Sequence, residues 1–359
     1  MARVCNFNPG PAVLPLEVLQ EAQAELLDFK GTGMSILESS HRGKEYMAVQ
    51  QEAVDNLRKL LGIPDEYAVL FLQGGASGQF AMVPMNLLGE GQSADYTNSG
   101  AWASKAIKEA KLFGKVNVIA DTAKDIPTRL PAPGSLKPTP GAVYLHVTSN
   151  ETIAGTQWKS FPKISVPLVA DMSSDFLSRS FDIKPFGLIY AGAQKNLGPA
   201  GVTLVIMRKE LAERVSEKVP VIFRYKTHIE ENSLYNTPPC FAIYIVTLVT
   251  RWILKMGGLD VMARRNVEKA AKVYSLIDAS SFYRGTAVKE FRSDMNITFR
   301  LPSEPLEEAF IKEASAQKLK GLKGHRSVGG IRASIYNAFP PENVDTLVAF
   351  MKEFERKNG

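Results

Sequence analysis

The chain has 359 residues, 45% of them apolar and 22% charged, a composition typical of a globular protein with room for a large domain and a smaller one. Its net charge of +6 is spread along the sequence and forms no basic stretch of the kind that binds nucleic acid. The two cysteines and four scattered histidines lack metal-site spacing, and no apolar stretch has the length of a signal peptide or a membrane span. We therefore expect a cytoplasmic protein without a metal, a nucleic-acid partner or a membrane anchor.

Helical and strand-like stretches alternate along most of the chain. In chain order, the apolar spacing predicts helices over 16–29, 45–61, 79–88, 104–113, 241–256, 259–277, 306–319 and 341–356. Strands are predicted over 67–72, 94–96, 116–120, 142–147, 166–170, 188–191, 202–207, 296–300 and 329–334. Alternation from 67 to about 260 is typical of a largely parallel α/β sheet with helices on both faces.

The pattern also divides the chain into three regions. Residues 1–15 are rich in proline and are expected to form an N-terminal arm. Residues 16–258 would form the large domain that contains the sheet. From 259 onward a long amphipathic helix is followed by α+β elements, so 259–359 would form a smaller C-terminal domain.

Polar residues stand where three of the predicted strands end. The glycine-rich turn 73–78 lies between a strand and a helix and would present backbone N–H groups to a phosphate, although tight packing alone would also explain it. Asp171 ends an apolar strand, where a carboxylate is costly unless it is paired or caps a helix. Lys195 lies in a glycine-rich turn after another strand. There it is either an exposed loop lysine or a desolvated amine of the kind that reacts with carbonyl groups.

Three further features are informative. Trp102 follows Gly100 at the start of a helix, where its ring would either pack in the core or stack on a flat cofactor. The polar loop 148–155 follows a strand, in the position where open α/β sheets bind ligands. Pro84 lies inside the helix predicted at 79–88, which it should kink or shorten.

These features follow one another in the order found in the aspartate-aminotransferase superfamily of fold-type I, pyridoxal-phosphate-dependent enzymes, and the chain resembles its class V members. The stretches that carry the resemblance are NFNPGPAVLP, SSHRGKEY, FLQGGASGQF, SNETIAGTQW, AGAQKNLGPAG, YNTPP and GHRSVGGIRASIYNA, which extend from residue 6 to residue 338. The resemblance implies a three-layer α/β fold with a mixed, mostly parallel large-domain sheet, a smaller α+β C-terminal domain, and pyridoxal 5′-phosphate (PLP) as cofactor.

The resemblance also implies roles for particular residues. Lys195 would hold the cofactor covalently and move protons, and Asp171 would pair with its pyridine nitrogen. The other cofactor-binding residues it implies are Ala76, Ser77, Trp102, Thr152 and Gln194, with Asn236 and Thr237 supplied by the other subunit of a homodimer. The substrate-binding residues it implies are His41, Arg42, His325, Arg326 and Arg332, with Arg332 clamping the α-carboxylate.

The matching stretches are most similar to a branch that exchanges an amino group between phosphoserine and 2-oxoglutarate in serine biosynthesis. The resemblance therefore implies a transaminase acting on small anionic amino acids and keto acids. Phosphohydroxythreonine, a substrate of some relatives in pyridoxine biosynthesis, is left open. Two positions depart from the pattern: Asn8-Pro9 stands where small or hydroxyl residues are more common, and Ser77 stands where some members have arginine.

Two alternatives remain open at this point. One is a different fold-type I enzyme, such as an alanine–glyoxylate transaminase or a cysteine desulfurase. A desulfurase needs a reactive loop cysteine, and neither Cys5 nor Cys240 is well placed for that role. The other is a non-catalytic protein that binds a phosphate-bearing ligand at 74–78. This hypothesis leaves Asp171 and Lys195 unexplained.

Overall fold

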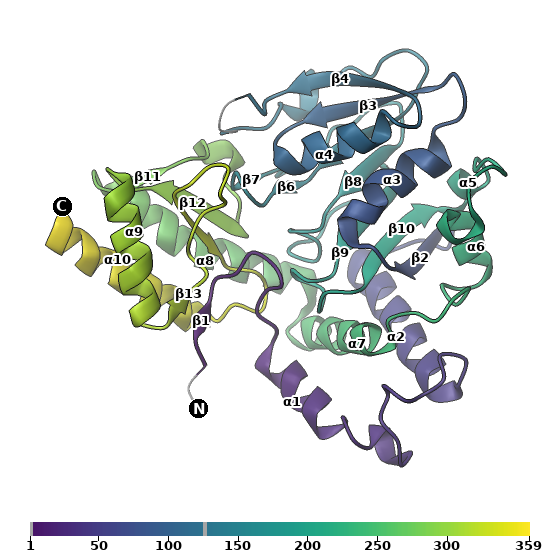
Figure 1. Ribbon diagram of the computed structural model, residues 1–359, viewed down its shortest axis with the longest axis horizontal. Helices are drawn as coiled ribbons and strands as arrows, with labels where there is room; N and C mark the ends of the chain where they lie inside the picture. The colour runs from purple at the N-terminus through teal and green to yellow at the C-terminus, as the bar shows by residue number, and fades with distance from the viewer. Residues whose placement is uncertain (1–2, 125–127) are drawn as a thin grey trace.

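The computed structural model describes residues 3–124 and 128–359, so the first two residues of the predicted arm lie outside it. Its main sheet has seven strands in the order β2-β10-β9-β8-β5-β3-β4 (Figure 1). These strands are β2 (Tyr67–Leu72), β3 (Ser93–Asn98), β4 (Lys115–Asp121), β5 (Ala142–Thr148), β8 (Leu168–Asp171), β9 (Phe186–Gly192) and β10 (Thr203–Arg208). β10 runs antiparallel to β2 and β9, and the other neighbouring strands are parallel. The predicted mixed, mostly parallel sheet is confirmed.

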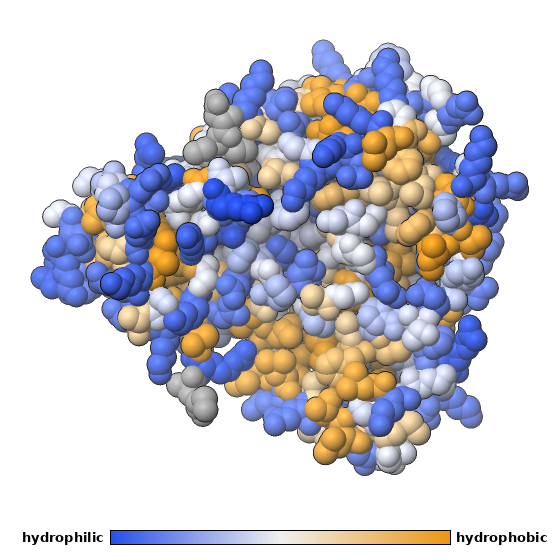
Figure 2. All heavy atoms as spheres, in the orientation of Figure 1, coloured by the Kyte–Doolittle hydropathy of each residue, from blue (hydrophilic) through white to orange (hydrophobic). Residues whose placement is uncertain are grey.

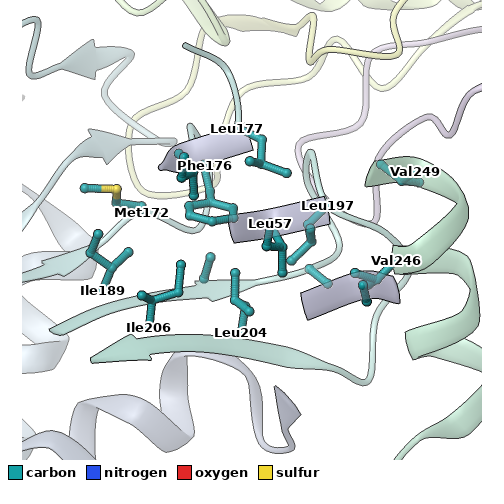
Figure 3. Close-up of a cluster of buried hydrophobic side chains, with 14 of the residues drawn as sticks. Leu57, Met172, Phe176, Leu177, Ile189, Leu197, Leu204, Ile206, Val246 and Val249 are labelled. Carbon is teal, nitrogen blue, oxygen red and sulfur yellow. The ribbon is translucent and has the colours of Figure 1, made fainter. Parts of the chain in front are cut away.

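Helices cover both faces of this sheet. α2 (Lys44–Leu61) and α7 (Cys240–Lys255) pack on one face, and α3 (Gly75–Leu87) and α4 (Ala101–Ala110) pack on the other. β9, whose sequence is FGLIYAG, is buried along its whole length because it is covered on both sides. Figure 3 shows part of the core under α2 and α7, where Leu57 and Val246 lie with Ile189 and Leu204 of the sheet.

A second core lies toward the C-terminus. A three-stranded sheet of β11 (Arg284–Gly285), β12 (Asn296–Arg300) and β14 (Ile331–Ser334) packs with α8 (Gly258–Ala279), α9 (Glu304–Ala316) and α10 (Pro341–Asn358). The N-terminal arm joins this core, because β1 (Cys5–Asn6) pairs in parallel with β13 (Leu319–Lys320) and Phe7 is fully buried there. The N-terminal arm therefore packs against the C-terminal core before the chain enters the large sheet.

The remaining elements are short and lie mostly at the surface or beside the loops. They are α1 (Leu16–Ala24), η1 (Phe29–Gly31), η2 (Pro133–Ser135), β6 (Asn150–Glu151), β7 (Thr156–Gln157), α5 (Lys209–Ala212), η3 (Val221–Phe223), α6 (Tyr225–Glu230) and η4 (Lys289–Phe291). No single described helix is both long enough and apolar enough to cross a membrane. α7 and α8 meet those criteria only as a pair, with a bend of 84° between them.

Five predicted helix boundaries were wrong by three residues or more, and two of them are the ends of α4 at Ala110 and of α9 at Ala316, each three residues before the predicted end. The first helix ends at Ala24 and not at 29, and Phe29 instead packs into the core from a separate short turn. α3 begins at Gly75, four residues earlier than predicted, and α4 begins at Ala101, three residues earlier. Pro84 does not end α3, which continues to Leu87. The glycine-rich turn and Trp102 therefore belong to the first turns of two helices.

Leu57 tests how much the core under α2 contributes to stability. It is 0% exposed, so Leu57→Ala should leave a cavity and lower the free energy of unfolding by about 2–5 kcal/mol, as measured by urea denaturation. Leu112 is 74% exposed and serves as the control: Leu112→Ala should change that free energy by about 0.5 kcal/mol or less. Equal losses for both variants would contradict the packing described here.

Candidate active site

A cavity of about 280 Å³ opens at the carboxyl ends of β8 and β9. It has the position expected for a ligand site in an open α/β sheet and approaches the volume of known small-molecule sites. The sequence-predicted residues that line it are Ala76, Ser77, Trp102, Thr152, Asp171, Gln194 and Lys195. The fold thus gathers side chains that are up to 119 positions apart, from residue 76 to residue 195, around one space.

One wall of the cavity is the N-terminus of α3. Gly74 and Gly75 have φ angles of +91° and +64°, which allow the chain to turn sharply from β2 into the helix. The helix begins at Gly75, so the N–H groups of Ala76 and Ser77 belong to the first turn and lack intrahelical acceptors. Those N–H groups, at the positive end of the helix dipole, form a binding site for an anion.

Asp171 brings a buried carboxylate to the cavity. It is the last residue of β8 and is 4% exposed. Burial raises its pKa to about 6, although a hydrogen bond from the Ser173 backbone N–H to Oδ1 (2.9 Å) and the charge of Lys195 act to lower it. A carboxylate held in this way is a strong partner for a cationic N–H group that enters the cavity.

Lys195 brings a buried amine to the same cavity. It follows β9 in a turn and donates a hydrogen bond from Nζ to the Pro9 carbonyl oxygen, at 2.6 Å. Burial lowers its pKa to about 8, and the charge of Arg332 lowers it further, while Asp171 opposes the shift. At pH 7 about a tenth of this amine is therefore neutral and nucleophilic, a far larger share than for an ordinary lysine.

The arm residues Pro9 and Gly10 take part in the site in a way that the sequence did not predict. The Pro9 carbonyl accepts hydrogen bonds from Lys195 and from the Tyr336 hydroxyl (2.7 Å). Gly10 has a φ of +142°, and a Cβ atom there would lie 2.8 Å from Cδ and Cε of Lys195. The loss of a backbone N–H at Pro9 is thus immaterial to Lys195, because the carbonyl makes the contact. The NPGP sequence was the available signal, but it was interpreted only as a turn.

The C-terminal region places the cation of Arg332 beside the cavity, whereas His325 and Arg326 line a separate hollow with Glu307 and Glu308. Arg332 lies on β14, is 6% exposed, and donates from Nη1 to the Thr152 carbonyl oxygen at 3.4 Å, while its Nε has no partner. His325 and Arg326 lie in the loop before β14, and burial together with the charges of Arg332, Arg326 and Lys105 lowers the pKa of His325. Among the described residues Arg332 and Arg326 form no salt bridge, so this cluster suits anionic ligands.

The remaining predicted residues lie away from Lys195 within one chain. Arg42 lines a separate hollow with Met47 and Gln50, and His41 precedes it in the same loop. Asn236 lines an apolar cavity of about 330 Å³ outside the site, and Thr237 is exposed beside it. Within a single chain, these residues do not reach the cavity that contains Asp171 and Lys195.

Glu151 is a further buried residue that the sequence analysis missed. It is 0% exposed, directly precedes Thr152, and accepts hydrogen bonds from the start of α4. Nothing in the local pattern distinguishes it from an ordinary loop acid, because its partners are about 50 positions away in the sequence.

The fold and this site define an α/β transferase of the fold-type I kind, and the comparisons with known proteins agree. The Aminotransferase class-V family model matches residues 4–347. The chain is 58% identical to a phosphoserine aminotransferase of Desulfosudis oleivorans over 99% of both chains. Its structure resembles that of the phosphoserine aminotransferase from Bacillus circulans subsp. alkalophilus with a TM-score of 0.98, 55% identity and coverage of 99% of each chain.

A PLP-bound phosphoserine aminotransferase from Trichomonas vaginalis is also similar, with a TM-score of 0.94, 42% identity and coverage of 98% of this chain and 100% of that one. The chain therefore belongs to the aminotransferase class-V family. The family predicted from the sequence and the predicted transferase fold are both confirmed.

Gly10 gives a direct test of how Lys195 is positioned. Gly10→Ala should push the lysine side chain aside, because the new methyl group overlaps Cδ and Cε. The rate at which a small aldehyde plus borohydride modifies Lys195, followed by mass spectrometry, should fall about tenfold or more with the loss of a correctly oriented amine.

Gly31→Ala is the matched control. Gly31 also has a positive φ, +77°, but a Cβ atom there would meet nothing within 4 Å. It therefore carries the backbone strain without the contact, and modification of Lys195 should be unchanged. A similar loss in both variants would show that strain, and not the Lys195 contact, is responsible.

Proposed function

We propose that this protein is a phosphoserine aminotransferase that uses PLP to exchange an amino group between phosphoserine and 2-oxoglutarate, giving 3-phosphooxypyruvate and glutamate. One observation carries the proposal: a neutralisable amine, Lys195, and a buried carboxylate, Asp171, line one cavity beside an anion-binding helix N-terminus. Relatives that the chain matches over nearly its full length have this name. A coupled assay with phosphoserine and 2-oxoglutarate tests it, and absence of glutamate formation would refute it.

The residues present fit the cofactor. A phosphate fits the first turn of α3, where the N–H groups of Ala76 and Ser77 lack intrahelical acceptors. A ring nitrogen that carries a proton fits the buried carboxylate of Asp171. Trp102 supplies an aromatic face at the cavity, and its buried Nε1 has no partner among the residues that the structure describes. Thr152 and Gln194 complete the lining on the remaining sides.

PLP supplies an electron sink for the bond changes at the substrate Cα, and the protein supplies binding and proton transfer. Lys195 would be the base: with a pKa lowered to about 8, its neutral amine would take the proton from the substrate Cα and then deliver that proton to the cofactor, which restores the neutral amine. The Pro9 carbonyl accepts one N–H of Lys195 and so helps to aim the amine. Asp171 keeps the ring nitrogen protonated, because an ionised carboxylate in a buried site favours a cation beside it.

The proposed substrate-binding groups are the cation of Arg332, which contacts the cavity lining through the Thr152 carbonyl, and the cations of the loop before β14. Arg332 is buried, and its Nε lacks a partner among the described residues, so its planar group can donate two parallel hydrogen bonds to an α-carboxylate. His325 and Arg326 would hold the second anion, a phosphate in one half-reaction and a distal carboxylate in the other. Both substrates then use one site in turn.

The proposed active unit is a homodimer with shared sites. Large apolar side chains are exposed on the segments around α1 and beside α6, where Figure 2 shows apolar surface. They include Leu27, Leu37, Met47, Val221, Ile222 and Phe223. Exposed apolar side chains gathered on neighbouring segments favour an interface. His41, Arg42, Asn236 and Thr237 lie on these same segments, so a second copy would carry them to the cavity of its neighbour.

The chain has two His-Arg pairs, His41-Arg42 and His325-Arg326, which we expect to distinguish substrates with a second anionic group from substrates without one. Arg326→Ala and Arg42→Ala should each raise KM for phosphoserine about tenfold or more, because each removes a charge-assisted contact to the second anion. KM for alanine, which has no second anion, should change little. Steady-state rates of both reactions give the comparison, and equal increases for the two substrates would contradict these roles.

Mixing Lys195→Ala, which lacks the reacting amine, with Arg42→Ala, which has low activity at phosphoserine concentrations well below its raised KM, tests whether sites are shared at such a concentration. Lys195→Ala and Arg42→Ala subunits, unfolded and refolded together in equal amounts, should regain about a quarter of wild-type activity, since half the dimers are mixed and each has one intact site. Each variant refolded alone is the control and should stay near its own low activity. No gain on mixing would place Arg42 in the site of its own subunit.

Several finer points remain proposals. The proposed boundaries of 1–15, 16–258 and 259–359 agree with a change of core near α8. A cytoplasmic location and activity toward phosphohydroxythreonine also stay predictions, and the same coupled assay tests the second substrate. An alanine–glyoxylate type of specificity is disfavoured by Arg332 and the cations of the loop before β14, which suit a substrate with two anionic groups.

A further inference from the structure

A buried carboxylate that the proposed chemistry does not use lies behind the cavity. Glu151 ends β6 and is 0% exposed. Its Oε1 accepts hydrogen bonds from the Ser99 hydroxyl and from the Ala103 N–H, both at 3.2 Å, and its Oε2 accepts from the Trp102 N–H at 3.4 Å. A carboxylate is expensive to bury, so a position that keeps one needs a specific reason.

The partners of Glu151 explain why a carboxylate suits this place. The N–H groups of Trp102 and Ala103 belong to the first turn of α4 and have no acceptor within the helix. All three partners can donate, and an ionised carboxylate accepts at both oxygens without offering a donor of its own. Its negative charge also lies at the positive end of the helix dipole.

Gly100, the residue before α4, allows the Glu151 carboxylate to lie close to the start of the helix. A Cβ atom at Gly100 would lie 2.6 Å from Cδ of Glu151, so only glycine allows the carboxylate to approach the helix so closely. Glu151 is also continuous in sequence with Thr152, which lines the cavity. One side chain therefore links two walls of the site, the helix that carries Trp102 and the loop that carries Thr152.

We propose that Glu151 is a positioning residue: its carboxylate fixes the first turn of α4 and so holds the Trp102 ring against the cofactor. This inference rests on the proposed PLP site for its effect on binding, but its effect on α4 does not depend on any ligand. Burial raises the pKa of Glu151 to about 7, with Asp171 adding to the shift while the N–H groups of Ala103 and Trp102 oppose it. The measurements are therefore made at pH 8, where the group is mostly ionised.

Glu151→Gln is the test variant, because it keeps the size but turns an NH₂ group toward N–H donors. In the apoprotein, hydrogen exchange of the Trp102 and Ala103 amides should become about tenfold or more faster. The Kd for PLP, measured by equilibrium dialysis, should rise about tenfold. Unchanged exchange at these two amides would overturn the proposal whatever happens to PLP, whereas failure of the wild-type protein to bind PLP would overturn the proposed function and leave the exchange result to decide the inference.

Asp95→Asn is the matched control. Asp95 is also 0% exposed, lies on β3, and accepts hydrogen bonds from the Thr139 N–H (2.6 Å) and the Asn117 amide (2.9 Å), and none of these three residues lines the cavity. Asp95→Asn should lower the free energy of unfolding without changing the Kd for PLP. Should Glu151→Gln fail to fold, Ser99→Ala, which removes one donor to the same carboxylate, should show a smaller change of the same kind in both measurements.

A double-mutant cycle shows whether Glu151 acts through Trp102. In a Trp102→Ala background, Glu151→Gln should raise the Kd for PLP less than twofold, because the ring that it positions is gone. A second tenfold increase in that background would mean that Glu151 affects binding independently of Trp102, and it would overturn the positioning role.

Discussion

The site depends on one unfavourable arrangement: a lysine and an aspartate, both buried, face the same cavity. Desolvation lowers the pKa of Lys195 to about 8 and raises that of Asp171 to about 6, so burial brings both pKa values toward neutrality. The protein tolerates this because each group has a fixed partner, the Pro9 carbonyl for the amine and the Ser173 N–H for the carboxylate. A surface pair would be cheaper to fold, but the neutral share of its amine at pH 7 would be far smaller than that of Lys195.

The fold holds Asp171 and Lys195 in place from two sides. β8 and β9 are neighbours in the sheet and deliver Asp171 and the Lys195 turn to one edge, with a fully apolar core beneath them (Figures 1 and 3). The second core closes the other side, since Tyr336 and Lys195 share the Pro9 carbonyl. The N-terminal arm is thus held by the C-terminal region while it contacts the lysine, which couples the two cores through one carbonyl oxygen.

Burial of charge extends beyond the reacting groups. Glu151 and Asp171 are both buried, and the charge of Asp171 helps to raise the pKa of Glu151. Lys269 of α8 is 1% exposed and donates to the carbonyls of Ile335 (3.0 Å) and Tyr336 (2.6 Å), which anchors the segment after β14. Each such group costs free energy on its own and becomes acceptable only through directed hydrogen bonds. The pocket walls are therefore fixed by polar contacts as much as by apolar packing.

The sequence by itself determined the class of fold, because the alternation of apolar strands and helices, and the chemistry of strand ends at Asp171 and Lys195, are local patterns. It also identified Ala76, Ser77, Trp102, Thr152 and Gln194 through resemblance to a family, and the structure places all five around one cavity. Only the tertiary structure showed that Pro9, Gly10 and Glu151 belong to the site, and it placed Arg42 in a separate hollow within one chain. The physical reason is distance along the chain: these contacts join residues from about 50 to nearly 190 positions apart, and no local periodicity reports which distant backbone group a carbonyl or a carboxylate will meet.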